Sequence, residues 1–283
     1  METKLIKQIM GQAIAEKART FTYPLIIDDK SIGTAISIKL GEHYFLATAS
    51  HIIKNADEIK VITHNQITNP ITNFADKYCD NNVDLGLLEI LSSDSEYFDD
   101  FLSYDGFNDA INVENENPTM VIGYPSQYCN TEEEIMLSQK YIAKFTRCDS
   151  VTFHSNTLSH SKWPIDGLPD EYGNHKTLIK GQDILVEFLP KSEITPFTSK
   201  TAGTANPAIK CPPLHPCGMS GGGIWLSQLT EVKEKINIPD PRLIGIQLSW
   251  YKKRNILRGI KINAFLDFVK EKYPDINILC KSI

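Results

Sequence analysis

The sequence predicts an all-β fold that is divided into two strand-rich halves. Short apolar and β-branched runs recur along the 283-residue chain, and turn residues separate them. Only the two ends of the chain carry a helical pattern. The strand-rich halves meet near residues 112–119, and many short strands of this kind are typical of barrels or sandwiches.

The first element is a predicted amphipathic helix over residues 5–18. Its apolar residues recur at helical spacing between polar ones: Leu5, Ile6, Ile9, Met10, Ala13 and Ile14. This face is expected to pack either on the body of the chain or on a partner.

Strands follow from Phe21 onward. In chain order the first runs are Tyr23–Ile27, Thr34–Leu40, His43–Ala47, Ile59–Thr63, Leu85–Leu91 and Met120–Ile122. The second half carries the runs Tyr141–Thr146, Ile184–Leu189, Gly223–Leu226, Leu243–Leu248 and Gly259–Ile262. Leu40-Gly41-Glu42-His43 is typical of a hairpin turn between two of these strands.

A closing helix and two long loops complete the elements. Asn263 is a suitable N-cap for a helix over Ala264–Lys272, and Pro274 ends it. Residues 155–181 and 198–213 show no clear period and are interpreted as long loops, which in a compact domain tend to be functional.

Composition excludes several classes of function. The net charge is −6 and no long basic run occurs, so nucleic acid is not an expected partner. No stretch reaches the roughly 18 apolar residues that cross a bilayer, so no membrane association is expected. The first twenty residues lack the apolar core of a signal peptide, and we expect a cytoplasmic protein.

The six cysteines are irregularly spaced, which favours reduced thiols over a disulfide framework. The cluster Cys211-x3-His215-x-Cys217 has a partial zinc-ligand pattern. It lacks a clear fourth ligand and prolines interrupt it, so we expect no metal and no cofactor.

The most informative stretch is residues 216–223, which read Pro-Cys-Gly-Met-Ser-Gly-Gly-Gly. Glycines permit positive φ and allow backbone N–H groups to approach another molecule closely. A serine on such a loop is suited to act as a nucleophile beside an oxyanion hole. The alternative interpretation of Ser220 is a glycine-rich turn before a strand.

A nucleophilic serine needs a base and a group that orients the base. His51 follows an apolar strand and lies among small residues that leave room for the ring to face a cleft. Asp84 opens a mostly apolar strand, where a carboxylate needs donors that an imidazole N–H can supply. Asp76 and Asp80 are rivals in more polar surroundings. An ordinary histidine and a turn-ending aspartate are the alternative interpretations.

The order His, Asp, Ser is one of the known orders of a catalytic triad. The segments Ala47-Thr48-Ala49-Ser50-His51, Val83–Leu88 and Gly218–Gly222 resemble the three motif blocks of trypsin-like (chymotrypsin-fold) serine peptidases. Gly33-Thr34-Ala35 resembles the early strand of that family, and Leu243–Ile246 resembles the strand after the nucleophile. The similarity spans about residues 30–270 and is closest to bacterial members.

This resemblance implies two six-stranded antiparallel β-barrels with the triad in the cleft between them. It implies that His51 is the general base and then the general acid, that Asp84 fixes its tautomer, and that Ser220 attacks the carbonyl. The N–H groups of Gly218 and Ser220 would form the oxyanion hole.

Three residues depart from the family pattern. Met219 stands where secreted digestive relatives carry an aspartate that pairs with a newly cut N-terminus, so activation by that route is not expected. Leu214, near the base of the substrate pocket, disfavours basic P1 residues and favours apolar ones. Cys217, at the rim of the cleft, is either an accessible thiol or a small apolar residue.

By the same resemblance, Ser249 and Trp250 would align the substrate backbone as an added strand. The charged residues 251–255 follow and are either a solvated hairpin or a reader of acidic side chains.

The sequence thus predicts four regions: a helical extension (1–20), an N-terminal barrel (21–115), a C-terminal barrel (116–262) and a helix with a tail (263–283). The predicted function is a serine endopeptidase acting on a protein or peptide. It is expected to be selective and gated by an activating protein partner, as in stress or phage defence. The alternative is a catalytically silent binding module on the same scaffold.

Overall fold

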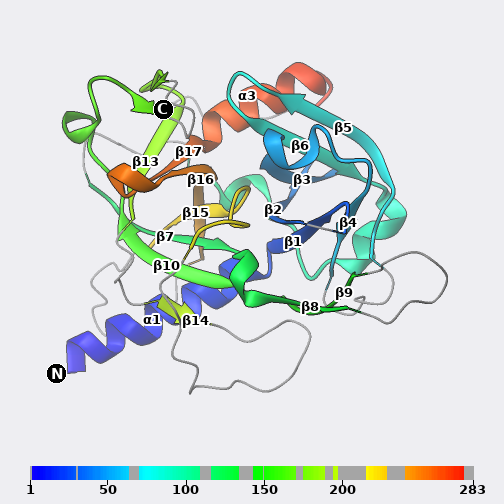
Figure 1. The fold of residues 1–283 in the computed structure, drawn as a ribbon, viewed down its shortest axis with the longest axis horizontal. Coiled ribbons are helices and arrows are strands. Elements are labelled where there is room, and N and C mark those ends of the chain that lie inside the picture. Colours follow the sequence, from blue (N-terminus) through cyan, green and yellow to red (C-terminus); the bar gives the residue numbers. More distant parts are fainter. Residues whose placement is uncertain are drawn as a thin grey trace.

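The computed structural model describes residues 2–29, 31–63, 70–108, 116–133, 143–148, 150–169, 175–188, 194–196, 215–227 and 240–276. Two antiparallel sheets lie side by side in these ranges, the first on the right and the second on the left of Figure 1. Leu214, which is predicted to lie near the base of the substrate pocket, and the predicted loop 198–213 are outside the described residues.

The first sheet has six strands in the order β4-β1-β2-β3-β6-β5. In chain order their bounds are β1 (Thr22–Ile27), β2 (Ser31–Leu40), β3 (His43–Ala49), β4 (Ile59–Val61), β5 (Phe74–Asp80) and β6 (Leu85–Ile90). Val61, on the edge strand β4, pairs with Ile71 of the segment that leads into β5 at the opposite edge. This pairing curls the sheet.

The second sheet has the order β13-β17-β16-β15-β7-β10-β14. In chain order its bounds are β7 (Pro118–Gly123), β10 (Val151–Asn156), β13 (Asp183–Glu187), β14 (Ile194–Pro196), β15 (Gly223–Leu226), β16 (Arg242–Tyr251) and β17 (Ile256–Lys261). Thr157, directly after β10, pairs with Val186 of β13, so the sheet closes on itself.

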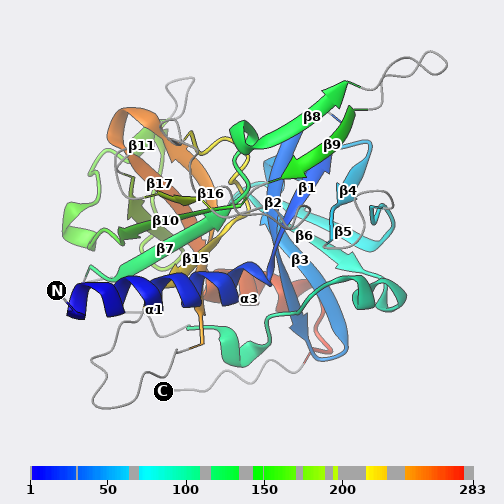
Figure 2. The same cartoon turned by 90° about the horizontal axis from the view of Figure 1, so that it is seen from below.

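Two small hairpins lie outside these sheets. β8 (Cys129–Glu133) pairs with β9 (Ala143–Cys148), and β11 (Leu168–Pro169) pairs with β12 (His175–Lys176). Figure 2 shows the β8–β9 hairpin projecting from the body of the molecule.

Helices α1 (Glu2–Arg19) and α3 (Ile262–Lys272) flank the sheets, and the short α2 (Ser50–Ile53) follows β3. In Figure 2, α1 runs along the second sheet beneath β7. The part of the chain that the structure describes also contains five 3-10 helices: η1 (Ser92–Tyr97), η2 (Tyr104–Gly106), η3 (Ser126–Tyr128), η4 (His160–Lys162) and η5 (Lys252–Arg254). Within the described residues, no helix has the length and apolar character needed to cross a membrane.

One apolar core is shared by the two sheets and by the helices. It contains Ile36 and Phe45 from the first sheet, Trp225 and Leu243 from the second, and Phe265 of α3. Ile14, Ala15 and Ala18 of α1 are part of the same core, so the N-terminal helix docks on its own chain. Burial of this apolar surface is the main stabilising contribution to the fold.

The predicted all-β fold class is confirmed, with β14 as a short seventh strand at the edge of the second sheet. The predicted hairpin is also confirmed: Leu40 pairs with His43, and Gly41 has a φ of 60°. The four predicted regions remain predictions; the first sheet uses residues 22–90 and the second uses residues 118–261.

Two local predictions were wrong. Asn263 lies inside α3 rather than at its cap, because Ile262, 1% exposed, is buried in the shared core and starts the helix earlier. The predicted loop 155–181 contains the end of β10 and the paired strands β11 and β12.

Candidate active site

His51 and Asp84 are in direct contact. The Nδ1 atom of His51 lies 2.8 Å from Oδ2 of Asp84 and 3.1 Å from Oδ1. A carboxylate only accepts hydrogen bonds, so Nδ1 carries the proton and Nε2 of the neutral ring keeps its lone pair. The imidazole is 45% exposed and the carboxylate 23%, so the ring is accessible while its partner is mostly covered.

The backbone holds this pair in register. The N–H of His51 donates to Oδ1 of Asp84 at 2.9 Å, and the N–H of Ser50 donates to the Asp84 carbonyl at 2.9 Å. Asp84 has a φ of 66°, a left-handed conformation that aspartate and asparagine tolerate better than most residues. The turn before β6 and the short helix after β3 are therefore joined at these residues.

The two rival aspartates lie elsewhere. Asp80 accepts from the N–H of Asn82 at 2.8 Å and stabilises the turn that leads to Asp84. Asp76 is exposed on β5.

Ser220 lies in the second of two consecutive tight turns that share Met219. The N–H of Met219 donates to the Pro216 carbonyl at 3.0 Å, and the N–H of Gly222 donates to the Met219 carbonyl at 2.8 Å. The third residues of these turns are Gly218, with a φ of 93°, and Gly221, with a φ of 92°. Type II turns require a positive φ at this position, which explains both glycines.

Every carbonyl from Cys217 to Ser220 accepts a hydrogen bond. Their donors are, in order, the Ser126 N–H at 2.8 Å, the Thr34 hydroxyl at 2.8 Å, the Gly222 N–H at 2.8 Å and the Thr34 N–H at 2.9 Å. In a trans peptide the N–H points away from the C=O, so these bonds also orient the amides.

Two amides of this loop remain free. Within the described part of the chain, the N–H groups of Gly218 and Ser220 have no hydrogen-bond partner. The N–H groups of Met219, Gly221 and Gly222 are all bonded. The loop thus presents two oriented donors beside the Ser220 side chain, an arrangement that suits a developing oxyanion.

The first sheet brings His51 toward this loop. Ile52, next to His51, packs on Gly33, where an added Cβ would lie 2.6 Å from the Ile52 Cγ2. The following residue, Thr34, is bonded to the Ser220 carbonyl. His51 and Ser220 therefore both border β2, although no hydrogen bond joins the imidazole to the Ser220 hydroxyl in the described structure.

Met219 anchors the Ser220 loop to the interior of the second sheet. Its side chain is fully buried in the apolar interior of the second sheet, and an added Cβ on Gly123 would lie 3.0 Å from the Met219 Cβ. Apolar packing therefore holds the loop at this position.

The predicted substrate-binding residues lie around this loop. Cys217 is exposed and its thiol is free. Ser249 and Trp250 are half-buried on β16, where they pair with β17. On its other side, β16 is bonded to β15 and the Ser220 loop only as far as Gln247, so Leu248–Tyr251 present an edge that is open within the described ranges.

No group of three or more metal-ligating side chains occurs among the described residues. Cys211, from the partial zinc pattern, lies outside them. His215 packs edge-on against Trp250 with the ring centres 4.8 Å apart.

Sequence reasoning missed the roles of Thr34 and Ser126 in holding the loop. In the sequence, Thr34 is part of the strand motif Gly33-Thr34-Ala35. A buried threonine beside a glycine in an apolar strand is a weak signal, and its partner lies 184 residues away.

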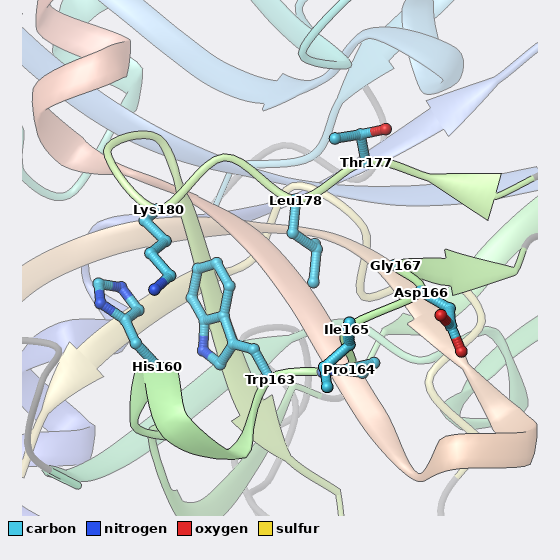
Figure 3. A pocket seen from close by; sticks show the side chains of 9 residues that line it. All are labelled: His160, Trp163, Pro164, Ile165, Asp166, Gly167, Thr177, Leu178 and Lys180. Carbon is cyan, nitrogen blue, oxygen red and sulfur yellow. The ribbon is translucent and has the colours of Figure 1, made fainter.

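A separate cavity of about 400 Å³ is lined by residues of the chain between β10 and β13. In Figure 3, the Trp163 ring stands between the side chains of Lys180 and Leu178, while Asp166 points away from them. None of the predicted site residues lines this cavity.

Comparison with known proteins adds little to this geometry. No family model and no curated protein matches the sequence. Among solved structures, the serine endoprotease from Yersinia pestis is similar, with a TM-score of 0.48 and 13% identity. The alignment covers 93% of this chain and 65% of that protein, so this chain spans less than two-thirds of its length.

Proposed function

We propose that this chain is a serine endopeptidase of the trypsin-like type, with His51, Asp84 and Ser220 as its catalytic residues. The observation that carries the proposal is the 2.8 Å contact between His51 Nδ1 and Asp84 Oδ2, because it leaves Nε2 as the acceptor on an accessible ring. The Ser220 loop, with its two free amides, borders the same strand, β2.

In this mechanism, Nε2 of His51 takes the proton of the Ser220 hydroxyl as the oxygen attacks the scissile carbonyl. The imidazolium that forms is stabilised by Asp84 and then protonates the leaving amine. Water, activated by the same ring, hydrolyses the acyl-enzyme and regenerates Ser220. The free N–H groups of Gly218 and Ser220 bind the oxyanion, and each such donor contributes about 3 kcal/mol to transition-state stabilisation.

The open edge of β16 supports the choice of a peptide as substrate. An extended peptide can pair, as an added strand, with those N–H and C=O groups of Leu248–Tyr251 that face away from β17 and have no partner among the described residues. Such pairing recognises backbone and is therefore independent of most side chains. It would lead the substrate directly past Ser220.

The oxyanion loop is held by hydrogen bonds and by buried Met219, so no newly cut N-terminus is needed to form it. We therefore assign any restraint on activity to access by the substrate or to an activating protein partner. The cytoplasmic location, the bacterial subtype and a role in stress or phage defence remain predictions. Rapid hydrolysis of unstructured casein by the isolated chain would contradict a gated enzyme.

A silent binding module is the second candidate. It is favoured by one observation, the missing hydrogen bond between His51 and Ser220 within the described structure. Such bonds are often long before substrate binds and shorten in the reacting complex, so the peptidase remains the better interpretation.

A fluorophosphonate probe separates the two candidates, because it modifies only an activated serine. Wild type should be labelled, and Ser220→Ala should not. Ser150→Ala is the matched control, since Ser150 is a buried serine outside the site and its loss should leave labelling unchanged. Absent labelling of wild type, or equal labelling of wild type and Ser220→Ala, would exclude the peptidase.

A further inference from the structure

Gln247 lies directly beside the nucleophile loop. Its N–H donates to the Gly222 carbonyl at 2.7 Å, and its carbonyl accepts from the Gly221 N–H at 2.7 Å. The backbone of Gln247 is thus bonded to both residues that follow Ser220. The open edge of β16 begins at the next residue, Leu248.

The Gln247 side chain points into the interior of the second sheet. Gln247 pairs with Gly259 across the strands, and directly opposed residues share one face of a sheet. An added Cβ on Gly259 would lie 2.4 Å from Ile224 and 3.2 Å from Ile184, which both belong to the interior core. Met219 of the Ser220 loop packs in that core as well.

This carboxamide is buried and unpaired. Gln247 is 1% exposed, and neither Oε1 nor Nε2 has a hydrogen-bond partner among the described residues. Buried side-chain polar atoms are nearly always paired, and an unpaired one lowers the stability of the fold. A glutamine in this position therefore calls for an explanation other than packing.

Trp250 adds a third unpaired polar atom on the same face. It pairs with Leu257, packs against the same interior core, and its Nε1 is buried without a partner. Its ring contacts His215 at the start of the Ser220 loop. Gln247 and Trp250 thus present two donor nitrogens, with three N–H groups in all, and one acceptor oxygen on the interior face of β16.

We propose that Gln247 sets the specificity of the proposed peptidase for P1, the substrate residue whose carbonyl Ser220 attacks. The inference rests on the proposed function and narrows its substrate class to chains cleaved after glutamine or asparagine. A P1 carboxamide is the complement of the three atoms: its oxygen accepts from Trp250 Nε1 and Gln247 Nε2, and its NH2 donates to Gln247 Oε1. An apolar P1 residue leaves these atoms unpaired, and a carboxylate cannot donate to Oε1.

This preference differs from the apolar P1 that Leu214 suggests in the sequence. The two predictions differ because the buried atoms of Gln247 and Trp250 are polar and unpaired, whereas the side chain of Leu214 is apolar. A site that hydrogen-bonds a substrate group discriminates strongly against a substrate that lacks the group, whereas an apolar wall discriminates only weakly.

The test is a peptide library, derived by digestion of whole-cell protein, that is exposed to the wild type and to two variants. Mass spectrometry of the new termini reports the P1 residue, with Ser220→Ala as background. Wild type should cleave mainly after glutamine and asparagine. In Gln247→Leu, cleavage after these residues should fall about tenfold to a hundredfold relative to cleavage after leucine. Gln12→Leu, an exposed change on α1, should keep the wild-type profile.

The other outcomes overturn either the specificity proposal or the proposed function. A wild-type preference for another P1 residue, or an unchanged profile in Gln247→Leu, overturns the specificity proposal. So does a wild type that reacts with the fluorophosphonate probe but cleaves no peptide after a carboxamide. If Gln247→Leu does not fold by circular dichroism, Gln247→Met removes the carboxamide at a similar length in this apolar interior and should show the same loss. Failure of wild type to react with the probe instead overturns the proposed function itself.

Discussion

The hydroxyl of Thr34 donates a hydrogen bond to the carbonyl of Gly218 at 2.8 Å, across the junction of the two sheets. The same hydroxyl accepts from the Tyr124 N–H at 2.9 Å, and the Thr34 N–H donates to Ser220. A buried strand residue of the first sheet therefore fixes two peptide planes of a loop that belongs to the second. The orientation of the free N–H groups of Gly218 and Ser220 therefore depends on the hydrogen bonds that Thr34 makes to this loop.

Thr34→Val should lower kcat about tenfold to a hundredfold with little change in KM, because it frees the Gly218 carbonyl without touching the substrate. Stability should fall by about 1–3 kcal/mol, since two buried backbone groups lose a partner. Steady-state kinetics and urea unfolding measure the two effects. Thr63→Val is the matched control: the Thr63 hydroxyl is buried without a partner in the described structure, so both values should stay near wild type.

Asp84→Asn should reduce the rate of fluorophosphonate labelling about a thousandfold or more. The amide NH2 would donate to Nδ1 of His51, so the ring takes the other tautomer and Nε2 can no longer accept the Ser220 proton. Asparagine tolerates the left-handed backbone at this position, so the fold should persist. Exposed Asp76→Asn should label like wild type; equal rates for the two variants would remove Asp84 from the mechanism.

Gly218→Ala should abolish labelling and destabilise the protein by more than about 2 kcal/mol. An added Cβ would lie 2.6 Å from the Tyr124 carbonyl oxygen and 2.7 Å from the Ser126 nitrogen, and neither backbone group can withdraw easily. Gly41→Ala has a comparable positive φ but meets nothing within 4 Å, so it should cost only about 1 kcal/mol and retain activity. Similar losses in both variants, by thermal unfolding, would show that backbone strain alone explains Gly218.

Arg258→Leu should destabilise the protein by about 3–5 kcal/mol, because it leaves the buried carboxylate of Asp183 without its main partner. The guanidinium reaches Asp183 Oδ1 at 2.7 Å, and both side chains are less than 5% exposed. Lys17→Ala breaks the exposed ion pair with Asp240 and should change stability by less than about 1 kcal/mol. Urea unfolding compares the two; equal effects would mean that burial of the Arg258 pair contributes nothing.

Local residue patterns in the sequence predict much of the fold. Strands such as β1 and β3 are apolar or β-branched and lie buried, so their sequences identify them. The sequence does not predict strand β5 because residues 74–80 carry three charged side chains and none of the seven residues is buried. It forms because it pairs along the whole of β6, whose own residues are mostly buried, and such pairing is not visible in the β5 sequence.

The candidate site shows the same division. Residue types and their neighbours were enough to single out His51, Asp84 and Ser220 in the sequence. The hydrogen bonds from Thr34 and Ser126, and the inward direction of Gln247, depend on which strands pair and in which register. These relationships are non-local and follow only from the folded chain.

The apolar core shared by the two sheets and by α3 has a consequence for how the molecule denatures. Each sheet also has an apolar interior of its own, but unfolding of either sheet would expose the shared core to water, so melting should proceed as a single cooperative transition. Reactivity at residue 220 would then vanish over the same temperature range as secondary structure, and a fragment carrying only one barrel would be inert.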